Sequence, residues 1–171
     1  MSHSSQPLGE LARDVIAALR TAGETVAFAE SLTAGLCTAA LADVPGASAV
    51  LRGGLVVYAT DLKARLAGVD QVLLDTRGAV DPEVARQLAA GAARACGADW
   101  GVGLTGVAGP DPQDGHPVGE VYVALRSDSC HAVRRLDLGE KCDGDGVDRR
   151  RCIREAAVSS AFSWLLQRVN Q

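Results

Sequence analysis

The chain has 171 residues, of which 47% are hydrophobic and 22% charged, and its formal net charge is -4. This length and apolar content predict one buried core, so we expect a single domain over residues 1–171, with residues 1–6 as a flexible tail. The acidic balance argues against a large basic surface for nucleic acid, and no apolar run approaches the roughly 18 residues of a membrane span.

The cysteine pattern indicates free thiols. The five cysteines are Cys37, Cys96, Cys130, Cys142 and Cys152, and none forms a CxxC pair or lies near a histidine pair. The first ten residues also lack the basic start and apolar run of a signal peptide. We therefore expect a reduced, cytoplasmic protein without zinc, another metal or a disulfide framework.

The first third of the chain alternates between helix and strand patterns. Apolar residues at helical spacing predict a helix over Leu8 to Ala22, and Gly23 ends it. The run Thr25 to Glu30 predicts a short strand, and helical character resumes from Ala34 to Ala42. Leu55 to Tyr58 then predict a buried strand.

Turn and cap residues divide the remaining chain. Thr60 and Asp61 are good caps for a short helix, and Asp81 followed by Pro82 predicts the start of a helix that ends at Cys96. The next segments are a strand running into a glycine-rich loop (98–109), a strand hairpin (120–127 and 130–138) and a closing helix from Val147 to Val169. This order predicts an α/β fold, a three-layer sandwich with a mixed β-sheet and helices on both faces.

The stretch FAESLTAG (28–35) places two hydroxyl residues between a strand and a helix. Ser31 and Thr33 can each cap the helix, which is the commoner use of a hydroxyl at this place. The same place also offers free helix N–H donors and a positive dipole end to a catalytic serine. The pattern alone leaves both interpretations open.

Three further segments could complete a catalytic site. Tyr58 and Lys63 are either a strand-end aromatic and a solvated lysine, or part of a site in which a desolvated Lys63 is the base. The loop from Thr105 through Gly106 to Gly109 is either a plain turn or a cradle of N–H groups for an oxyanion or phosphate. Four arginines near the start of the last helix are either solvated or hold a phosphate: Arg149, Arg150, Arg151 and Arg154. Of the histidines, only His116 lies close enough to this loop to be a minor candidate base.

Taken together, these segments resemble a known family. FAESLTAG, GGLVVYATDLKARLAGV, GAVDPEVA, LTGVAGPDPQDGHPVGEVYVAL and a final RxxxR helix occur in the order typical of the C-terminal domain of CinA, the competence/damage-inducible protein, also known as nicotinamide-nucleotide amidase. The resemblance extends from about Leu8 to Leu166. Two features depart from the usual pattern: AESLTAG replaces AESCTGG, and KCDGDGVD replaces a shorter turn.

The resemblance implies an amidase that hydrolyses the carboxamide of nicotinamide mononucleotide to nicotinate mononucleotide and ammonia, in pyridine-nucleotide salvage. It places the nucleophile at Ser31, the base at Lys63, and supporting catalytic groups at Tyr58 and Thr105. We expect the substrate to contact the following residues: Glu30, Thr33, Gly106, Gly109, Arg150 and Arg154.

The resemblance also implies a small-molecule substrate, no cofactor, no nucleic-acid or membrane partner, and a homo-oligomer, most simply a dimer. Longer members carry an additional N-terminal domain linked to pyrophosphatase activity, and none of its chemistry is expected of these 171 residues. A weakly catalytic or non-catalytic nucleotide-binding module linked to competence or DNA damage is the alternative.

Overall fold

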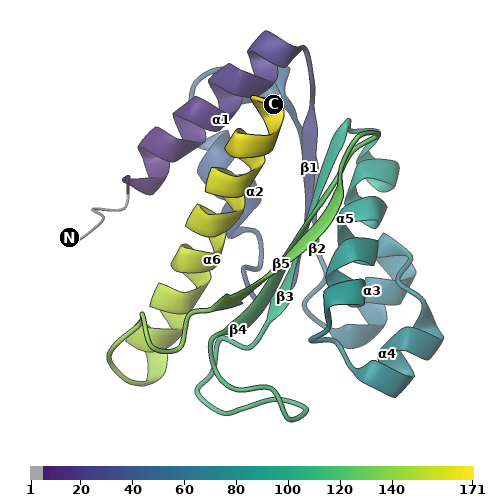
Figure 1. Cartoon of the computed structure of the whole chain (residues 1–171), viewed down its shortest axis with the longest axis vertical. Coiled ribbons are helices and arrows are strands. Elements are labelled where there is room, and N and C mark those ends of the chain that lie inside the picture. The colour runs from purple at the N-terminus through teal and green to yellow at the C-terminus, as the bar shows by residue number, and fades with distance from the viewer. Residues whose placement is uncertain (1–5) are drawn as a thin grey trace.

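A computed structural model describes residues 6–171, and its centre is one five-stranded sheet in the order β2-β1-β3-β4-β5 (Figure 1). The strands are β1 (Val26–Glu30), β2 (Leu51–Val56), β3 (Trp100–Gly106), β4 (Glu120–Arg126) and β5 (His131–Asp137). The helices are α1 (Leu8–Ala22), α2 (Leu36–Ala42), α3 (Thr60–Ala67), α4 (Gln71–Arg77), α5 (Pro82–Cys96) and α6 (Gly146–Val169), with a short 3-10 turn η1 (Ala47–Ala49). The expected tail at residues 1–6 lies almost wholly outside the described residues.

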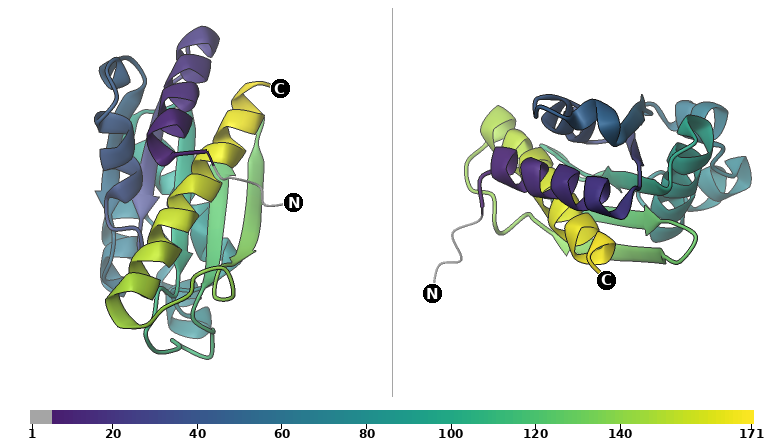
Figure 2. Two further views of the ribbon diagram at one scale, coloured as in Figure 1. Left: turned by 90° about the vertical axis from the view of Figure 1, so that its left-hand side faces the viewer. Right: turned by 90° about the horizontal axis from the view of Figure 1, so that it is seen from above.

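Helices cover both faces of this sheet. α1, α2 and α6 pack on one face, and α3, α4 and α5 pack on the other (Figures 1 and 2). β1 runs parallel to both β2 and β3, whereas β4 and β5 are antiparallel additions. The predicted α/β three-layer sandwich with a mixed sheet is therefore confirmed. Within residues 6–171, every helix is too short or too polar to cross a bilayer.

The sequence of β3 explains how closely the layers approach. Trp100, Val102 and Leu104 alternate with glycines, so one face of the strand carries large side chains for the core under α1 and α6. The opposite face is bare, and a Cβ at Gly101 or Gly103 would come within 2.3 Å of the backbone of α5. The glycines thus let α5 lie directly against the sheet.

Two details of the first half differ from the sequence prediction. The second strand covers Leu51–Val56 rather than Leu55–Tyr58, because Gly53 and Gly54 hide its first half from a hydrophobic pattern. A Cβ at Gly54 would lie 2.1 Å from Thr38 Oγ1 of α2, so packing requires the glycine there. The predicted cap of α3 is also wrong: Ala59 occupies the N-cap position and no side chain caps the helix.

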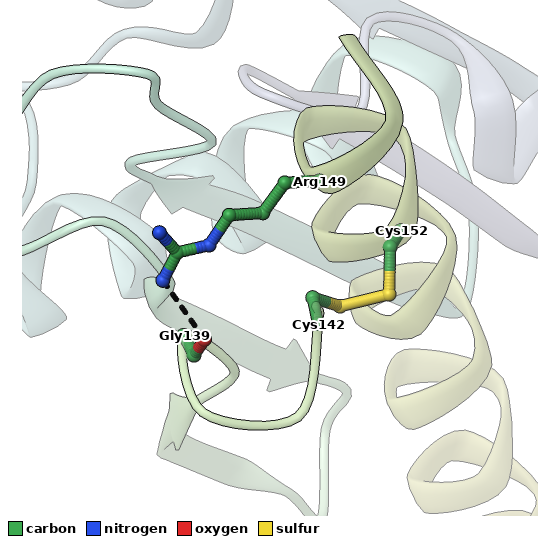
Figure 3. Close-up of a disulfide and its surroundings, with 4 residues drawn as sticks. All are labelled: Gly139, Cys142, Arg149 and Cys152. Atoms are coloured by element: carbon green, nitrogen blue, oxygen red, sulfur yellow. Dashed lines mark hydrogen bonds between the residues drawn. A yellow bond between two sulfur atoms is a disulfide. The ribbon is translucent and has the colours of Figure 1, made fainter. Parts of the chain in front are cut away.

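The expectation that all five cysteines are reduced is wrong for one pair. Cys142 and Cys152 form a disulfide, while Cys37, Cys96 and Cys130 carry free thiols. The loop after β5 folds back on the second turn of α6, which brings together two cysteines ten residues apart (Figure 3). Arg149 Nη2 donates a hydrogen bond of 2.9 Å to Gly139 O and fixes the same loop (Figure 3).

We expect the disulfide to stabilise the fold by limiting the conformational entropy of the unfolded chain. For a loop of this length, Cys142→Ser should lower the free energy of unfolding by about 2–3 kcal/mol. Urea unfolding under oxidising conditions measures this, with Cys96→Ser as the control because Cys96 is a free thiol. An equal loss in both variants would contradict a role for the disulfide.

Candidate active site

The carboxyl ends of the three parallel strands bring the predicted catalytic residues to one edge of the sheet. Ser31 follows β1 and donates a backbone hydrogen bond of 3.0 Å to Leu104 O, which places it beside the end of β3. On the other side, Val57 N donates to Glu30 O at 2.9 Å and continues the pairing of β2 with β1. In a parallel sheet this edge is where ligand sites form.

The turn after Ser31 is held by Glu30 rather than by a hydroxyl cap. Glu30 is fully buried, and its carboxylate accepts backbone hydrogen bonds from Gly35, Cys37 and Thr38 and a further one from Thr38 Oγ1, all between 2.8 and 3.0 Å. These are the free N–H groups at the start of α2, so a negative charge satisfies them and the helix dipole together. Neither Ser31 nor Thr33 caps this helix.

Two of the predicted substrate contacts, Glu30 and Thr33, are not among the residues that line the cavity at this edge. The Glu30 carboxylate has no exposed surface and is used by α2, so it is not available to a ribose or a pyridinium. Thr33 is fully buried, and its Oγ1 has no hydrogen-bond partner within residues 6–171. Ser31, which is 9% exposed, is left without a capping role and lines a cavity.

Lys63 is the most unusual group at this edge. Only 1% of the residue is exposed, and its Nζ donates to Val57 O at 2.9 Å and to Tyr58 O at 3.1 Å. Burial lowers the pKa of Lys63 to about 8, although the nearby charge of Asp61 acts in the opposite direction. A neutral amine that uses both N–H bonds on carbonyl groups keeps its lone pair free, so Lys63 is suited to accept a proton.

The packing of α3 against α5 places this lysine. A Cβ at Gly91 of α5 would lie 2.0 Å from Ala67 O, so the glycine lets the end of α3 approach α5 closely. Arg94 Nη2 donates to the same carbonyl oxygen at 2.9 Å. These contacts fix α3, which carries Lys63, against α5 on the face of the sheet that α5 covers.

A cavity of about 100 Å³ joins the predicted catalytic groups. Four of its lining residues are Ser31, Tyr58, Lys63 and Thr105. Thr105 is 1% exposed and donates its hydroxyl proton to Ala79 O at 2.6 Å, which leaves its oxygen lone pairs as acceptors. Within residues 6–171, no hydrogen bond joins Ser31 Oγ to Lys63 Nζ.

The loop after β3 forms another wall of the cavity. Gly106 and Gly109 line it as predicted, and Gly109 has a φ of 91° that favours glycine. Asp111 and Gln113 also line it and were missed, although both are polar residues in the loop that follows a predicted site strand. His116 is not among the lining residues, because its Nδ1 is 2.8 Å from Glu120 Oε1.

The two predicted phosphate-binding arginines occupy different places. Arg150 lines the cavity and donates hydrogen bonds to Gly109 O and to Tyr58 Oη. Arg154, one helical turn later, is not among the lining residues. Its guanidinium donates to Leu32 O at 2.8 Å and to Thr33 O at 3.0 Å. These bonds use two of the five N–H donors of the guanidinium on the backbone of the Ser31 turn.

Comparison with known proteins shows which family this chain belongs to. The family model described as the CinA C-terminal domain matches residues 8–169. The chain belongs to the CinA C-terminal domain family. It is 46% identical over 138 residues to a CinA-like protein of Frankia casuarinae, covering 81% of this chain and 30% of that protein. It is 37% identical over 153 residues to a competence-damage inducible protein of Streptococcus pneumoniae, covering 90% of this chain and 35% of that protein.

Solved structures of the CinA family match over nearly the whole chain. The competence/damage inducible protein CihA of Agrobacterium tumefaciens has a TM-score of 0.87 and 35% identity, covering 100% of both chains. A CinA superfamily protein of Klebsiella pneumoniae has a TM-score of 0.88 and 26% identity, covering 96% of this chain and 99% of that one. The chain thus spans about a third of the curated relatives and the full length of these solved structures.

One departure from the CinA pattern lies in the turn itself. Ala34 stands where the pattern AESCTGG has a glycine, and its φ of 49° is left-handed. That conformation costs a residue with a Cβ about 1 kcal/mol. The turn keeps this conformation in spite of the alanine, since Ala34 N donates to Ser31 O at 3.1 Å and Gly35 N donates to Glu30.

The lowered pKa of Lys63 should appear in the pH dependence of stability. Between pH 8 and 10.5 the unfolded chain holds a proton that the folded chain has lost, so the free energy of unfolding rises with pH in this window. In the wild type this increase in the free energy of unfolding should be about 3 kcal/mol, and Lys63→Met should abolish it. Urea unfolding from pH 7 to 10.5 measures it, with the exposed Lys141→Met as the control. The same slope in wild type and Lys63→Met would show that Lys63 has an ordinary pKa.

Proposed function

We propose that this chain is an amidase that hydrolyses the carboxamide of nicotinamide mononucleotide through an acyl-enzyme on Ser31. The observation that carries the proposal is the buried Lys63, whose pKa is lowered to about 8, in one cavity with Ser31 and Thr105. A serine hydroxyl is a weak nucleophile until a nearby base accepts its proton. The resemblance to the CinA family supplies the substrate class.

The proposed reaction begins when Lys63 Nζ accepts the Ser31 hydroxyl proton and Ser31 Oγ attacks the carboxamide carbon. The tetrahedral intermediate collapses as the nitrogen receives the proton and leaves as ammonia. Lys63 then removes a proton from water, which attacks the ester and releases nicotinate mononucleotide and free Ser31. Thr105, fixed by its bond to Ala79 O, accepts a hydrogen bond from Ser31 or Lys63 during these proton transfers.

The size of the cavity fits the part of the substrate that reacts. A cavity of about 100 Å³ has room for several water molecules, so it can admit the carboxamide beside Ser31 and Lys63. In the proposed complex the ribose and phosphate lie towards the exposed rim, where Tyr58 and Arg150 meet. Arg150 is the phosphate ligand in this arrangement. A homodimer and a cytoplasmic location remain predictions.

Substitution of the proposed nucleophile is the direct test. Ser31→Ala should reduce ammonia release from nicotinamide mononucleotide by at least about a thousandfold, because the proposed acyl-enzyme forms on Ser31 Oγ. Coupled detection of ammonia measures this, with Ser163→Ala on the exposed face of α6 as the control. Ordinary turnover by Ser31→Ala would rule out the nucleophile.

A nucleotide-binding module with little catalysis is the second candidate. It is favoured by the two carbonyl acceptors that hold Lys63 Nζ and by the lack of a Ser31–Lys63 hydrogen bond within the described residues. An ammonia assay with nicotinamide mononucleotide, nicotinamide riboside and free nicotinamide separates the two candidates. Calorimetric binding of the nucleotide without ammonia from any of the three compounds would favour the binding module.

The rate should depend on pH through Lys63. Because neutral Lys63 is the base, kcat/KM should rise with pH through an apparent pKa of about 8. Asp61→Asn removes a charge that raises the pKa of Lys63, so the rise should move to lower pH. The profile is measured with Asp75→Asn of α4 as the control. A shift to higher pH, or none, would show that Lys63 is not the titrating base.

A further inference from the structure

The contacts of Arg154 indicate a role different from ligand binding. Its two hydrogen bonds go to Leu32 O and Thr33 O, the two carbonyl groups that follow Ser31 in the chain, although 122 and 121 residues separate them in sequence. The planar guanidinium group offers donors in a fixed arrangement, and its charge makes such bonds stronger than neutral ones. Arg154 therefore fixes two successive peptide groups of the turn.

The same turn is held from its other end by a charge of opposite sign. The Glu30 carboxylate accepts from the N–H groups of Gly35, Cys37 and Thr38, while Arg154 donates to the carbonyl groups before them. Residues 31–35 belong to neither a helix nor a strand. Their backbone conformation therefore depends on these two side chains together with the bonds of Ser31 N to Leu104 O, Ala34 N to Ser31 O and Leu36 N to Thr33 O.

Fixing this backbone leaves a donor free beside the nucleophile. Within residues 6–171, neither a backbone nor a side-chain acceptor pairs with Leu32 N, and Leu32 lines the cavity together with Ser31. A free N–H directly after a nucleophilic serine is placed to stabilise the oxyanion of a tetrahedral intermediate. Leu32 N–H shares a peptide plane with Ser31 O, which accepts from Ala34 N, and the two carbonyl groups that Arg154 holds belong to the next two peptide planes of the turn.

We propose that Arg154 is a positioning residue, which holds the Ser31 turn so that Ser31 Oγ and Leu32 N–H face the substrate together, and that it is not a phosphate ligand. This inference rests on the proposed amidase function. Arg150 and Arg154 then divide two tasks along one face of α6: Arg150 contacts the rim of the cavity and Arg154 contacts the nucleophile turn.

Steady-state kinetics of Arg154→Met with nicotinamide mononucleotide and nicotinamide riboside provide the main test. A small misplacement of reacting groups costs on the order of a hundredfold in rate, so kcat should fall by about 10- to 100-fold for both substrates with KM nearly unchanged. Arg154→Lys keeps the charge and one donor and should recover part of kcat. Arg151→Met is the matched control, since Arg151 is exposed and, among the described residues, its side chain bonds to Glu155 alone.

A phosphate ligand would give a different pattern. If Arg154→Met raises KM for the nucleotide by at least about tenfold, keeps kcat and leaves the riboside unaffected, Arg154 binds phosphate and the proposal is wrong. Unchanged kinetics with both substrates would also overturn it. Arg150→Met supplies the expected pattern of a phosphate ligand for comparison.

Amide hydrogen exchange tests the positioning role without any catalysis. Arg154→Met should speed exchange in the peptide that covers residues 31–38, whereas Arg151→Met should not, and the rest of the chain reports whether each variant is folded. If the wild type releases no ammonia but Arg154→Met speeds exchange in residues 31–38, the proposed amidase function is wrong while Arg154 is still shown to fix the turn. If exchange in residues 31–38 is unchanged in a folded Arg154→Met variant, Arg154 does not fix the turn and the proposal is wrong.

Discussion

The buried carboxylate of Glu30 is the interaction on which the candidate site depends. A charge without solvent contact is costly to bury unless hydrogen bonds compensate it, and here four donors at the start of α2 do so. Because Glu30 ends β1 and its partners begin α2, one side chain fixes how the strand passes into the helix. The intervening residues, including Ser31, are thereby kept in an irregular turn that faces the cavity.

The sheet topology brings the other groups to this turn. β2 and β3 flank β1 in parallel, so the chain leaves all three strands at the same edge, after Glu30, Val56 and Gly106. α3 brings Lys63 back under the residues that follow β2, and α6 brings arginines from the far end of the sequence. The site thus combines three strand ends with one helix from each layer (Figure 1).

Much of this arrangement was predictable from the sequence, for reasons that differ between elements. The layers follow from apolar periodicity, whereas the place of Ser31, Lys63 and Thr105 after strand patterns only made them candidates, and the resemblance to the CinA family gave their roles. The surroundings of Glu30, Thr33 and Arg154 could not be predicted, because the partner of a buried polar group depends on backbone direction and, for Arg154, on residues 121 or 122 positions away. The Cys142–Cys152 pair was missed because the fold of a polar loop, not the spacing, brings the two sulfur atoms together.

Glu30 has one further effect, on the thiol of Cys37. Burial and then the negative charge of Glu30 raise the pKa of this thiol well above its ordinary value, in spite of its place in the first turn of a helix, where thiols are commonly acidified. The sulfur is therefore held as a protonated, poorly nucleophilic group. A cysteine six residues from Ser31 is consequently protected from alkylation and oxidation, and the turn is insensitive to electrophiles that attack thiolates.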